Sequence, residues 1–197
     1  MQLLKSVAKT SDYLRGRGIS DATQEYYSNR YDEENGTVMF PYVTPNGQLA
    51  ALKKRRTDSK FFMYERGGIP VRELVYGINL AHRDGHKTAI VTEAEIDAEY
   101  AYECTEILGI AMGTSAISDE KVSVIERSPI EELIIGSDND EAGEKLKKQI
   151  IKKFGLIRLY TIEIPEGCKD LNDMTPQQLQ EAIANKKAVE TSLFNVA

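Results

Sequence analysis

Cysteine and histidine are scarce in this chain of 197 residues. Its cysteines are Cys104 and Cys168, and its histidines are His82 and His86. Two thiols do not form a disulfide framework, and these few side chains lack the spacing of a zinc knuckle. The cysteine usage favours a reducing compartment, so we expect a cytoplasmic protein with free thiols.

Long apolar runs are also missing. No stretch of the sequence approaches the roughly 18 residues that a membrane-spanning helix needs. The first ten residues, MQLLKSVAKT, contain no long apolar segment typical of a signal peptide. With 41% hydrophobic and 28% charged residues, the composition is that of a globular protein of one or two domains. We therefore expect no membrane partner.

The net charge of −6 is distributed unevenly along the chain. Residues 1–86 carry a net charge of +3, whereas residues 87–197 carry −9. A mildly basic first part and an acidic second part suit a protein that holds a polyanion with one and metal ions with the other. Solvated acidic helices would account for many of these charges equally well.

The first 85 residues predict a small α+β unit. Residues 10–35 have a polar, helical pattern, in which SDYLRGRGIS (11–20) predicts a helix followed by a turn. The stretches TVMFPYV (37–43), QLAALKK (48–54) and KFFMYE (60–65) predict strands, the first two joined by a TPNG turn. Residues 72–85 predict a short helix closed by Gly85. We place a domain boundary near residue 85.

From residue 87 strands and helices alternate. We expect strands at 87–93, 110–113, 131–138 and 156–165, and helices at 94–109, 118–128, 139–155 and 175–187. Gly109 is expected to end the first of these helices, and Thr175 with Pro176 to open the last. Such alternation predicts an α/β fold, with a mostly parallel sheet and helices on both of its faces.

Acidic side chains follow three of the predicted strands. Glu93 and Asp97 follow the first, Asp138 and Asp140 the third, and Asp170 and Asp173 the fourth. Parallel strands bring their carboxyl ends to one edge of the sheet, so these acids would gather there and repel one another unless cations lie among them. Oxygen ligands without nearby His or Cys favour Mg²⁺ or Mn²⁺. Taken singly, Asp97 suits a first helical turn, Asp140 a helix cap and Asp170 a turn.

These motifs together resemble the TOPRIM-containing catalytic core of a DnaG-type primase. The matching stretches are VTEAEIDAEYAYECTEILG, GTSAIS, SDNDEAGEK and KDLNDM, preceded by YLRGRGIS, FPYVTPNGQLAALKKRRTDSKFF and LVYGI. The resemblance covers roughly residues 12–175. It implies a basic primase-core subdomain (1–85), a TOPRIM metal-binding domain (86–175), and a C-terminal helix and tail (176–197).

The resemblance also implies an activity and its residues. The chain would synthesise short RNA primers on a single-stranded DNA template from ribonucleoside triphosphates, by metal-dependent nucleotidyl transfer. The implied reacting and metal-binding residues are Glu93, Asp138 and Asp140, and Asp170 is implied as a further metal ligand. The implied supporting residues are Asp97, Asn172 and Asp173. The basic residues implied to bind template and nucleotide are Lys53, Arg55, Arg56 and Lys60. Glu93 could instead serve as a general base.

The sequence departs from the family pattern in several places. Ala94 replaces a usual glycine, and Asn172 stands where many primases have a second aspartate. The chain contains no Cys/His zinc-binding motif and no helicase domain, so we expect a separate zinc-binding domain or helicase as a partner. A TOPRIM-type nuclease and a non-catalytic single-stranded-DNA-binding accessory protein remain alternative interpretations. The basic KKRR stretch is also typical of an edge strand kept charged against aggregation.

Overall fold

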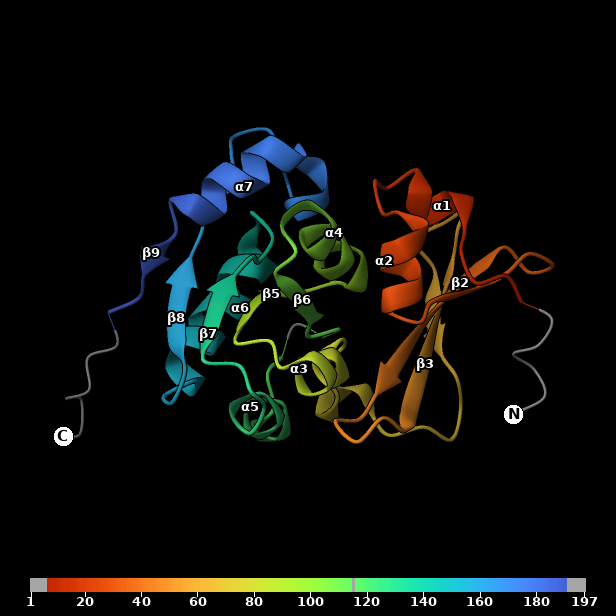
Figure 1. The fold of residues 1–197 in the computed structure, drawn as a ribbon, viewed down its shortest axis with the longest axis horizontal. Helices are drawn as coiled ribbons and strands as arrows, with labels where there is room; N and C mark the ends of the chain where they lie inside the picture. Colours follow the sequence, from red (N-terminus) through yellow and green to blue (C-terminus); the bar gives the residue numbers. More distant parts are fainter. Residues whose placement is uncertain (1–6, 115, 191–197) are drawn as a thin grey trace.

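The computed structural model describes residues 7–114 and 116–190. Residues 1–6, Ser115 in the GTSAIS stretch and the tail from residue 191 lie outside the described part. Two sheets lie side by side, one formed by the N-terminal third of the chain and one by the rest (Figure 1). Within the described ranges, the helices are all too short or too polar to span a bilayer.

The N-terminal part is α+β, as predicted. Helices α1 (Asp12–Arg15) and α2 (Asp21–Tyr26) each start at a serine cap. An antiparallel sheet follows in the order β1-β2-β3-β4, formed by Arg30–Asp32, Thr37–Val43, Leu49–Arg56 and Phe62–Tyr64. The turn expected after the helix in SDYLRGRGIS is present, with φ at 78° at Gly18. The helical pattern expected as far as residue 35 is wrong at its end, because α2 stops at Tyr26 and the chain enters β1 at Arg30.

A short connection leads to the second sheet. It contains a 3₁₀ turn, η2 (Val71–Glu73), and helix α3 (Ile78–Asp84), which ends at Gly85 as predicted. The helix begins later than residue 72 for two reasons. Gly77 is left-handed, with φ at 79°, and Tyr76 forms a β-bridge to Ala111. An alanine Cβ at position 77 would approach the Gly109 carbonyl oxygen to 2.8 Å.

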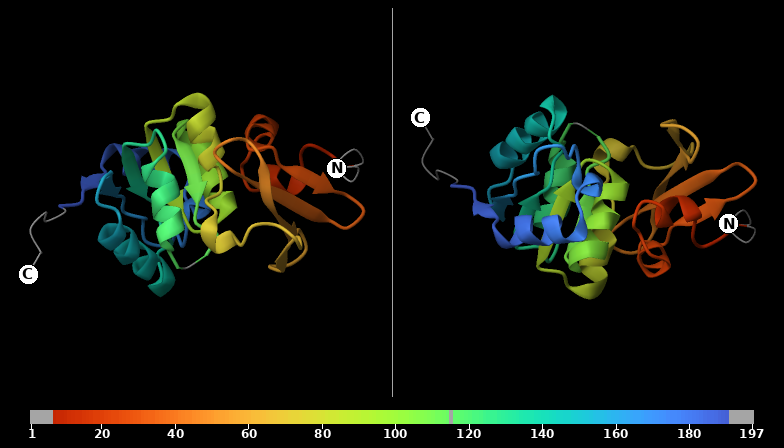
Figure 2. Two further views of the ribbon diagram at one scale, coloured as in Figure 1. Left: turned by 90° about the horizontal axis from the view of Figure 1, so that it is seen from below. Right: turned by 90° about the horizontal axis from the view of Figure 1, so that it is seen from above.

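The second sheet has the order β6-β5-β7-β8-β9. Strands β5 (Thr88–Thr92), β6 (Leu108–Ala111), β7 (Glu132–Ile135) and β8 (Arg158–Thr161) are parallel, and β9 (Lys187–Ala188) is antiparallel to β8. Helices α4 (Glu95–Thr105) and α7 (Pro176–Ala184) pack together over one face, while α5 (Asp119–Glu126) and α6 (Glu141–Lys153) cover the other (Figures 1 and 2). The predicted α/β fold is confirmed.

Gly109 has a different role from the one predicted. Helix α4 already ends at Thr105, where Glu106 adopts a left-handed conformation with φ at 58°. Gly109 lies inside β6, and a Cβ there would come within 1.8 Å of the Ala98 carbonyl oxygen. Glycine is thus needed for close packing of α4 on β6, not as a helix stop.

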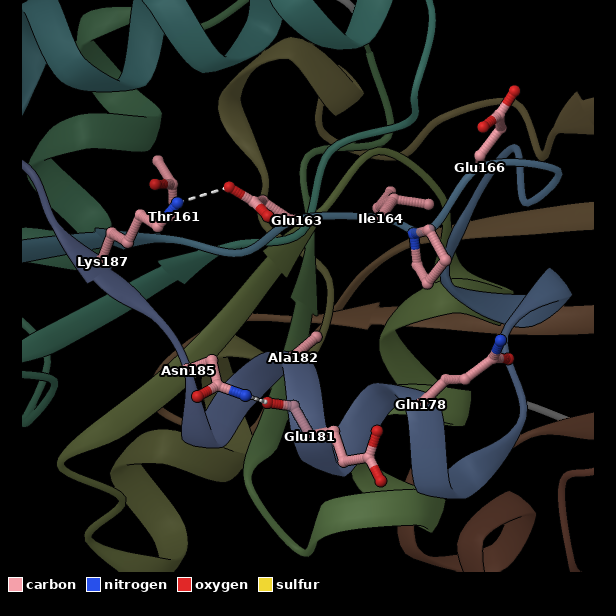
Figure 3. A pocket seen from close by; sticks show the side chains of 10 residues that line it. Thr161, Glu163, Ile164, Glu166, Gln178, Glu181, Ala182, Asn185 and Lys187 are labelled. Carbon is pink, nitrogen blue, oxygen red and sulfur yellow. Dashed lines mark hydrogen bonds and ion pairs between the residues drawn. The ribbon is translucent and has the colours of Figure 1, made fainter.

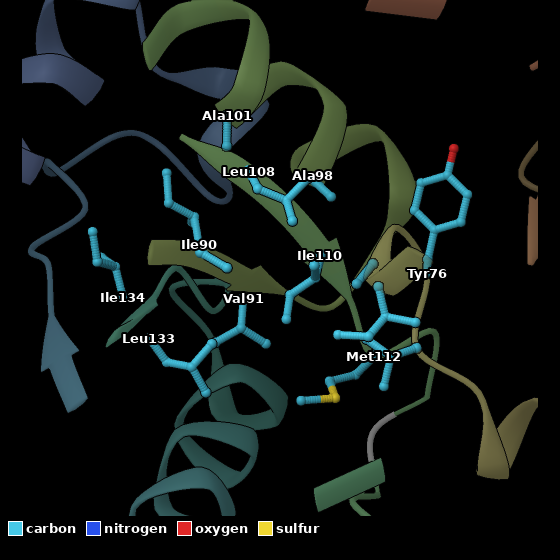
Figure 4. Packing of buried hydrophobic residues seen from close by; sticks show 14 of the residues in the cluster. Tyr76, Ile90, Val91, Ala98, Ala101, Leu108, Ile110, Met112, Leu133 and Ile134 are labelled. Atoms are coloured by element: carbon cyan, nitrogen blue, oxygen red, sulfur yellow. The ribbon is translucent and has the colours of Figure 1, made fainter. Parts of the chain in front are cut away.

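The core lies between these layers. Ile90 of β5 lies on the side of the sheet that Ala98 and Ala101 of α4 cover, while Val91 of β5 and Leu133 of β7 lie on the other side, all fully buried (Figure 4). This packing fixes the start of α4 over the end of β5, which determines where the acidic residues lie.

Buried polar groups join the two parts of the chain. Asn29 Nδ2 donates to both carboxylate oxygens of Glu99, each at 2.8 Å, and Tyr76 Oη donates to Glu99 at 2.6 Å. Tyr27 Oη donates to the Gly109 carbonyl at 2.8 Å. Burial raises the pKa of Glu99 to about 8. The N-terminal sheet is therefore anchored to α4 and β6 next to the acidic edge.

Candidate functional site

The carboxyl ends of β5, β7 and β8 meet at one edge of the parallel sheet. Glu93 directly follows β5, Asp138 lies three residues after β7, and the Asp170 segment follows β8. The backbone N–H of Asn139 donates to the carbonyl of Lys169 at 2.7 Å, which ties the second acidic segment to the third. The backbone N–H of Asn172 donates to Asp97 Oδ1 at 3.2 Å, which ties the third to helix α4.

The Glu93 carboxylate is half-buried, and few groups around it offset its negative charge. Within the described residues its buried Oε1 has no hydrogen-bond partner. Burial, reinforced by the charges of Asp138 and Asp140, raises the pKa of Glu93 to about 7. A carboxylate in this position would gain from a cation, because a buried charge without a partner is costly.

Two further acids have raised pKa values for related reasons. Burial and the neighbouring charge of Asp170 raise the pKa of Asp138 to about 6. Burial raises the pKa of Asp97 to about 8, with contributions from Asp170 and Asp138. These acids therefore share one electrostatic environment, as expected for carboxylates gathered at a single site.

Asp140 and Asp170 also cap helical turns. Asp140 Oδ1 accepts from the Gly143 N–H at 3.0 Å at the start of α6, which lowers the pKa of Asp140. Asp170 Oδ1 accepts from the Asp173 N–H at 3.1 Å at the start of the 3₁₀ turn η3 (Leu171–Asp173). The simpler capping roles are thus present, and each uses only one oxygen of the carboxylate.

A lysine is the cation nearest to these acids. Lys169 Nζ lies 3.7 Å from Asp140 Oδ2 and 4.0 Å from Asp138 Oδ2. Among the residues that the structure describes, no three His, Cys, Asp or Glu side chains stand close enough together to hold a metal ion as they are. The donor set nevertheless fits Mg²⁺ or Mn²⁺, because it consists of carboxylate oxygens and includes the unpartnered Glu93 Oε1.

The basic residues of β3 divide between its two faces. Lys53 points inward, and its Nζ lies 2.7 Å from Glu95 Oε2, with both side chains under a tenth exposed. This burial differs from the template-facing position expected for Lys53. Arg55 Nε donates to Tyr13 Oη at 3.3 Å, Arg56 pairs with Asp58 at 2.5 Å, and Lys60 is exposed.

Several residues at the site were not singled out from the sequence. Arg17 Nη1 donates to Asn172 Oδ1 at 3.0 Å, and Asn172 Nδ2 donates back to the Arg17 carbonyl at 2.8 Å. Glu95 accepts from Lys53 and from Tyr42 Oη. The only signal for Arg17 was its place in YLRGRGIS. Nothing in the sequence distinguished Glu95 as a buried partner, since its neighbours in the fold come from distant strands.

Two surface hollows lie near the end of β8, and only the smaller of the two is lined by a candidate acid. The one drawn in Figure 3 lies between the segment after β8 and helix α7, where Lys187 pairs with Glu163 at 2.5 Å. None of the candidate acids lines it. A smaller hollow is lined by Asp138 together with Ser137 and Lys147.

Comparisons with known proteins agree with this architecture. Residues 90–175 match the Toprim-like family model. Among solved structures, the DnaG primase catalytic domain bound to single-stranded DNA has a TM-score of 0.74 at 14% identity, over 90% of this chain and 71% of that one. The primase fragment of the bacteriophage T7 primase-helicase has a TM-score of 0.72 at 21% identity, over 91% and 79%.

The Aquifex aeolicus primase, solved with its zinc-binding and RNA polymerase domains, has a TM-score of 0.72 at 17% identity. The match covers 90% of this chain, which spans 56% of that structure's length. A search of curated proteins found no match. Residues 90–175 therefore match the Toprim-like family model, and the chain has the fold of the DnaG-type primase catalytic core.

Proposed function

We propose that the chain is a primase core that makes short RNA primers on single-stranded DNA by metal-dependent nucleotidyl transfer. The observation that carries the proposal is the edge where β5, β7 and β8 end. There Glu93 and Asp138 have pKa values raised to about 7 and about 6, and Glu93 Oε1 is buried without a hydrogen-bond partner in the described chain. The fold shared with primase cores supports it.

The carboxylates would bind two or three Mg²⁺ or Mn²⁺ ions. Glu93, Asp138, Asp140 and Asp170 are the proposed ligands, with Asp97 and Asp173 supporting them and Asn172 fixing the third acidic segment. Bound divalent ions supply positive charge that offsets the triphosphate and favours attack by a 3′ oxygen. Lys169 would leave Asp138 and Asp140 when they bind a cation.

The protein's own groups would hold the reactants and the proton. Glu93 has an alternative role to that of metal ligand: with its pKa raised to about 7, it could instead accept a proton as the general base. Arg55, Arg56 and Lys60 would contact template or nucleotide phosphates. Lys53 is paired with Glu95 and would act on the groove indirectly, through its neighbours.

Partners follow from the same proposal. The template is single-stranded DNA and the substrates are ribonucleoside triphosphates. The Aquifex aeolicus structure includes a zinc-binding domain, and the T7 fragment comes from a primase-helicase. We propose that this core works with a zinc-binding domain or a helicase, in the cytoplasm.

The test is incorporation of labelled ribonucleotides on single-stranded DNA with Mg²⁺ or Mn²⁺. The wild type should give short labelled products, and Asp138→Asn should give none. Asp119→Asn is the matched control, because Asp119 opens α5 and pairs with Lys153 on the surface. Cleavage of the template in place of synthesis would identify a nuclease. Binding to the template with neither reaction, even with a zinc-binding primase domain added, would identify an accessory protein.

A further inference from the structure

The edge strand β4 exposes a run of large apolar side chains. The exposed fractions of Phe61, Phe62 and Met63 are 59%, 47% and 49%. Strand β4 ends the order β1-β2-β3-β4 and pairs only with β3 in the described sheet. Exposed apolar side chains in such a run mark an interaction surface.

Phe62 differs from its neighbours in its surroundings. It lies opposite Arg55 in the pairing of β3 with β4, on the same face as Tyr64, whose ring meets it edge-on with centroids 6.1 Å apart. Lys53 Nζ lies over the Phe62 ring, 4.4 Å from its centroid. One face of the ring is thus covered by a buried cation, while almost half of the residue stays exposed.

A chain of buried contacts holds that cation in place. Lys53 Nζ donates to Glu95 Oε2 at 2.7 Å, and Tyr42 Oη donates to the other oxygen of Glu95. Glu95 opens helix α4, two residues after Glu93. The Phe62 ring is therefore attached through a short rigid path to the helix that begins at the acidic edge.

The charges around the ring suit a polyanion. Residues 53–66 contain six lysines and arginines but only two acids. Lys53, Lys54 and Arg56 each pair with an acidic side chain, and the other three, Arg55, Lys60 and Arg66, have no acidic partner among the described residues. A protein strand docking on β4 would gain backbone pairing but would have no use for this charge. Phosphates alone would not need exposed aromatic rings. Single-stranded nucleic acid uses both, because its bases stack on aromatic faces while its phosphates contact cations.

We propose that Phe62 is a stacking platform for a base of the single-stranded DNA template, and that Lys53, held by Glu95, supports the ring from behind instead of contacting phosphate. The inference rests on the proposed function for the identity of the strand. It gives the buried Lys53–Glu95 pair a role in template binding that its lack of exposure would otherwise exclude.

The test compares two fluorescent probes by anisotropy, without metal or nucleotides. One is an oligo-dT strand, and the other is an abasic strand of the same length and charge. Phe62→Ala should weaken binding of oligo-dT about 5- to 150-fold, equivalent to about 1–3 kcal/mol for one stacked base. It should leave the abasic strand's affinity unchanged, because the phosphate contacts remain. Phe62→Tyr keeps the aromatic face and should bind as the wild type does.

Phe61→Ala is the matched control. It removes an equally large and more exposed ring one position away, just before β4 begins, where among the described residues the ring lacks the contacts with Lys53 and Tyr64 that Phe62 makes. We expect less than a twofold change in its affinity for oligo-dT. Each variant is first compared with the wild type by thermal melting, so that lost binding is not confused with lost folding.

Three results would overturn the inference. Phe62→Ala could bind oligo-dT as the wild type does, or lose affinity for both probes equally, or raise the KM for ribonucleotides without changing template affinity. The last result would assign the ring to the incoming nucleotide. The first two results come from binding alone and do not depend on primer synthesis, which is measured separately with Asp138→Asn, and the third is read only where the wild type makes primers. Failure of the inference and failure of the proposed function are therefore distinguishable.

Discussion

Removing the buried amine of Lys53 should destabilise the protein strongly. Lys53 Nζ and Glu95 Oε2 are 2.7 Å apart, with side chains 8% and 3% exposed. In Lys53→Met, Glu95 would remain buried, and among the described residues the Tyr42 hydroxyl would be its one remaining hydrogen-bond donor. A buried charge that loses its partner costs about 3–5 kcal/mol of unfolding free energy. Because Tyr42 still donates, we expect about 3 kcal/mol.

The change should be visible in thermal melting. For a chain of this length, about 2–4 °C of melting temperature corresponds to 1 kcal/mol, so the loss is about 6–12 °C. The double variant Lys53→Met/Glu95→Gln should recover much of it, since it removes the uncompensated charge while Gln still accepts from Tyr42.

Arg56→Met is the matched control on the same strand. Arg56 pairs with Asp58, but these side chains are 50% and 61% exposed, and such surface pairs contribute about 0–1 kcal/mol. If Lys53→Met costs no more than Arg56→Met, Lys53 is not held by Glu95, and its predicted role as a free phosphate contact would stand.

Three further outcomes follow from the structure. The raised pKa of Asp97, about 8, means that its protonated form favours folding, so the stability it contributes is fully present below about pH 4 and is lost as the pH rises through about 8. In EDTA, the urea concentration at the midpoint of unfolding should therefore fall between pH 5 and pH 9 for the wild type, and it should fall less for Asp97→Asn. An equal fall in both proteins would refute the role given to Asp97. Asp140→Ala should lose primer synthesis and also the α6 cap, which should lower the free energy of unfolding by about 1 kcal/mol in denaturant melts. Asp140→Asn should keep the cap and lose only primer synthesis. Equal stability of the two variants would count against the cap. Gly109→Ala should abolish folding or lower the free energy of unfolding by more than about 3 kcal/mol in urea melts, because the new Cβ would lie 1.8 Å from a backbone carbonyl oxygen. Gly155→Ala is the control and should leave the stability nearly unchanged, because open space surrounds that position.

The sequence predicted the elements that depend on local patterns. The cap at Thr175 and the turn at TPNG are confirmed, because capping and turn chemistry involve residues within a few positions of one another. The alternation of strands and helices then placed the acids at one sheet edge, since parallel strands share the direction of their ends. The Toprim-like match over residues 90–175 agrees with the fold that this alternation predicts.

What the sequence did not predict depends on long-range contacts. Gly109 has the signature of a helix stop, and only the closeness of α4 to β6 explains its place inside a strand. Lys53 belongs to a basic run that looks solvated, yet strand alternation turns it toward Glu95, 42 positions away. Arg17 reaches Asn172 across 155 positions. Such pairs are set by tertiary packing, which a single sequence does not display.

The central claim is that the acids stand at the strand ends to bind divalent cations. It is tested most directly by melting the protein in rising Mg²⁺ or Mn²⁺, beside Asp138→Asn and the surface control Asp119→Asn. At a metal concentration 100 times the Kd, binding should add about 2.7 kcal/mol, or about 5–11 °C, to the wild type and to Asp119→Asn. Asp138→Asn should gain much less. An equal rise in all three proteins, or none in the wild type, would contradict the claim.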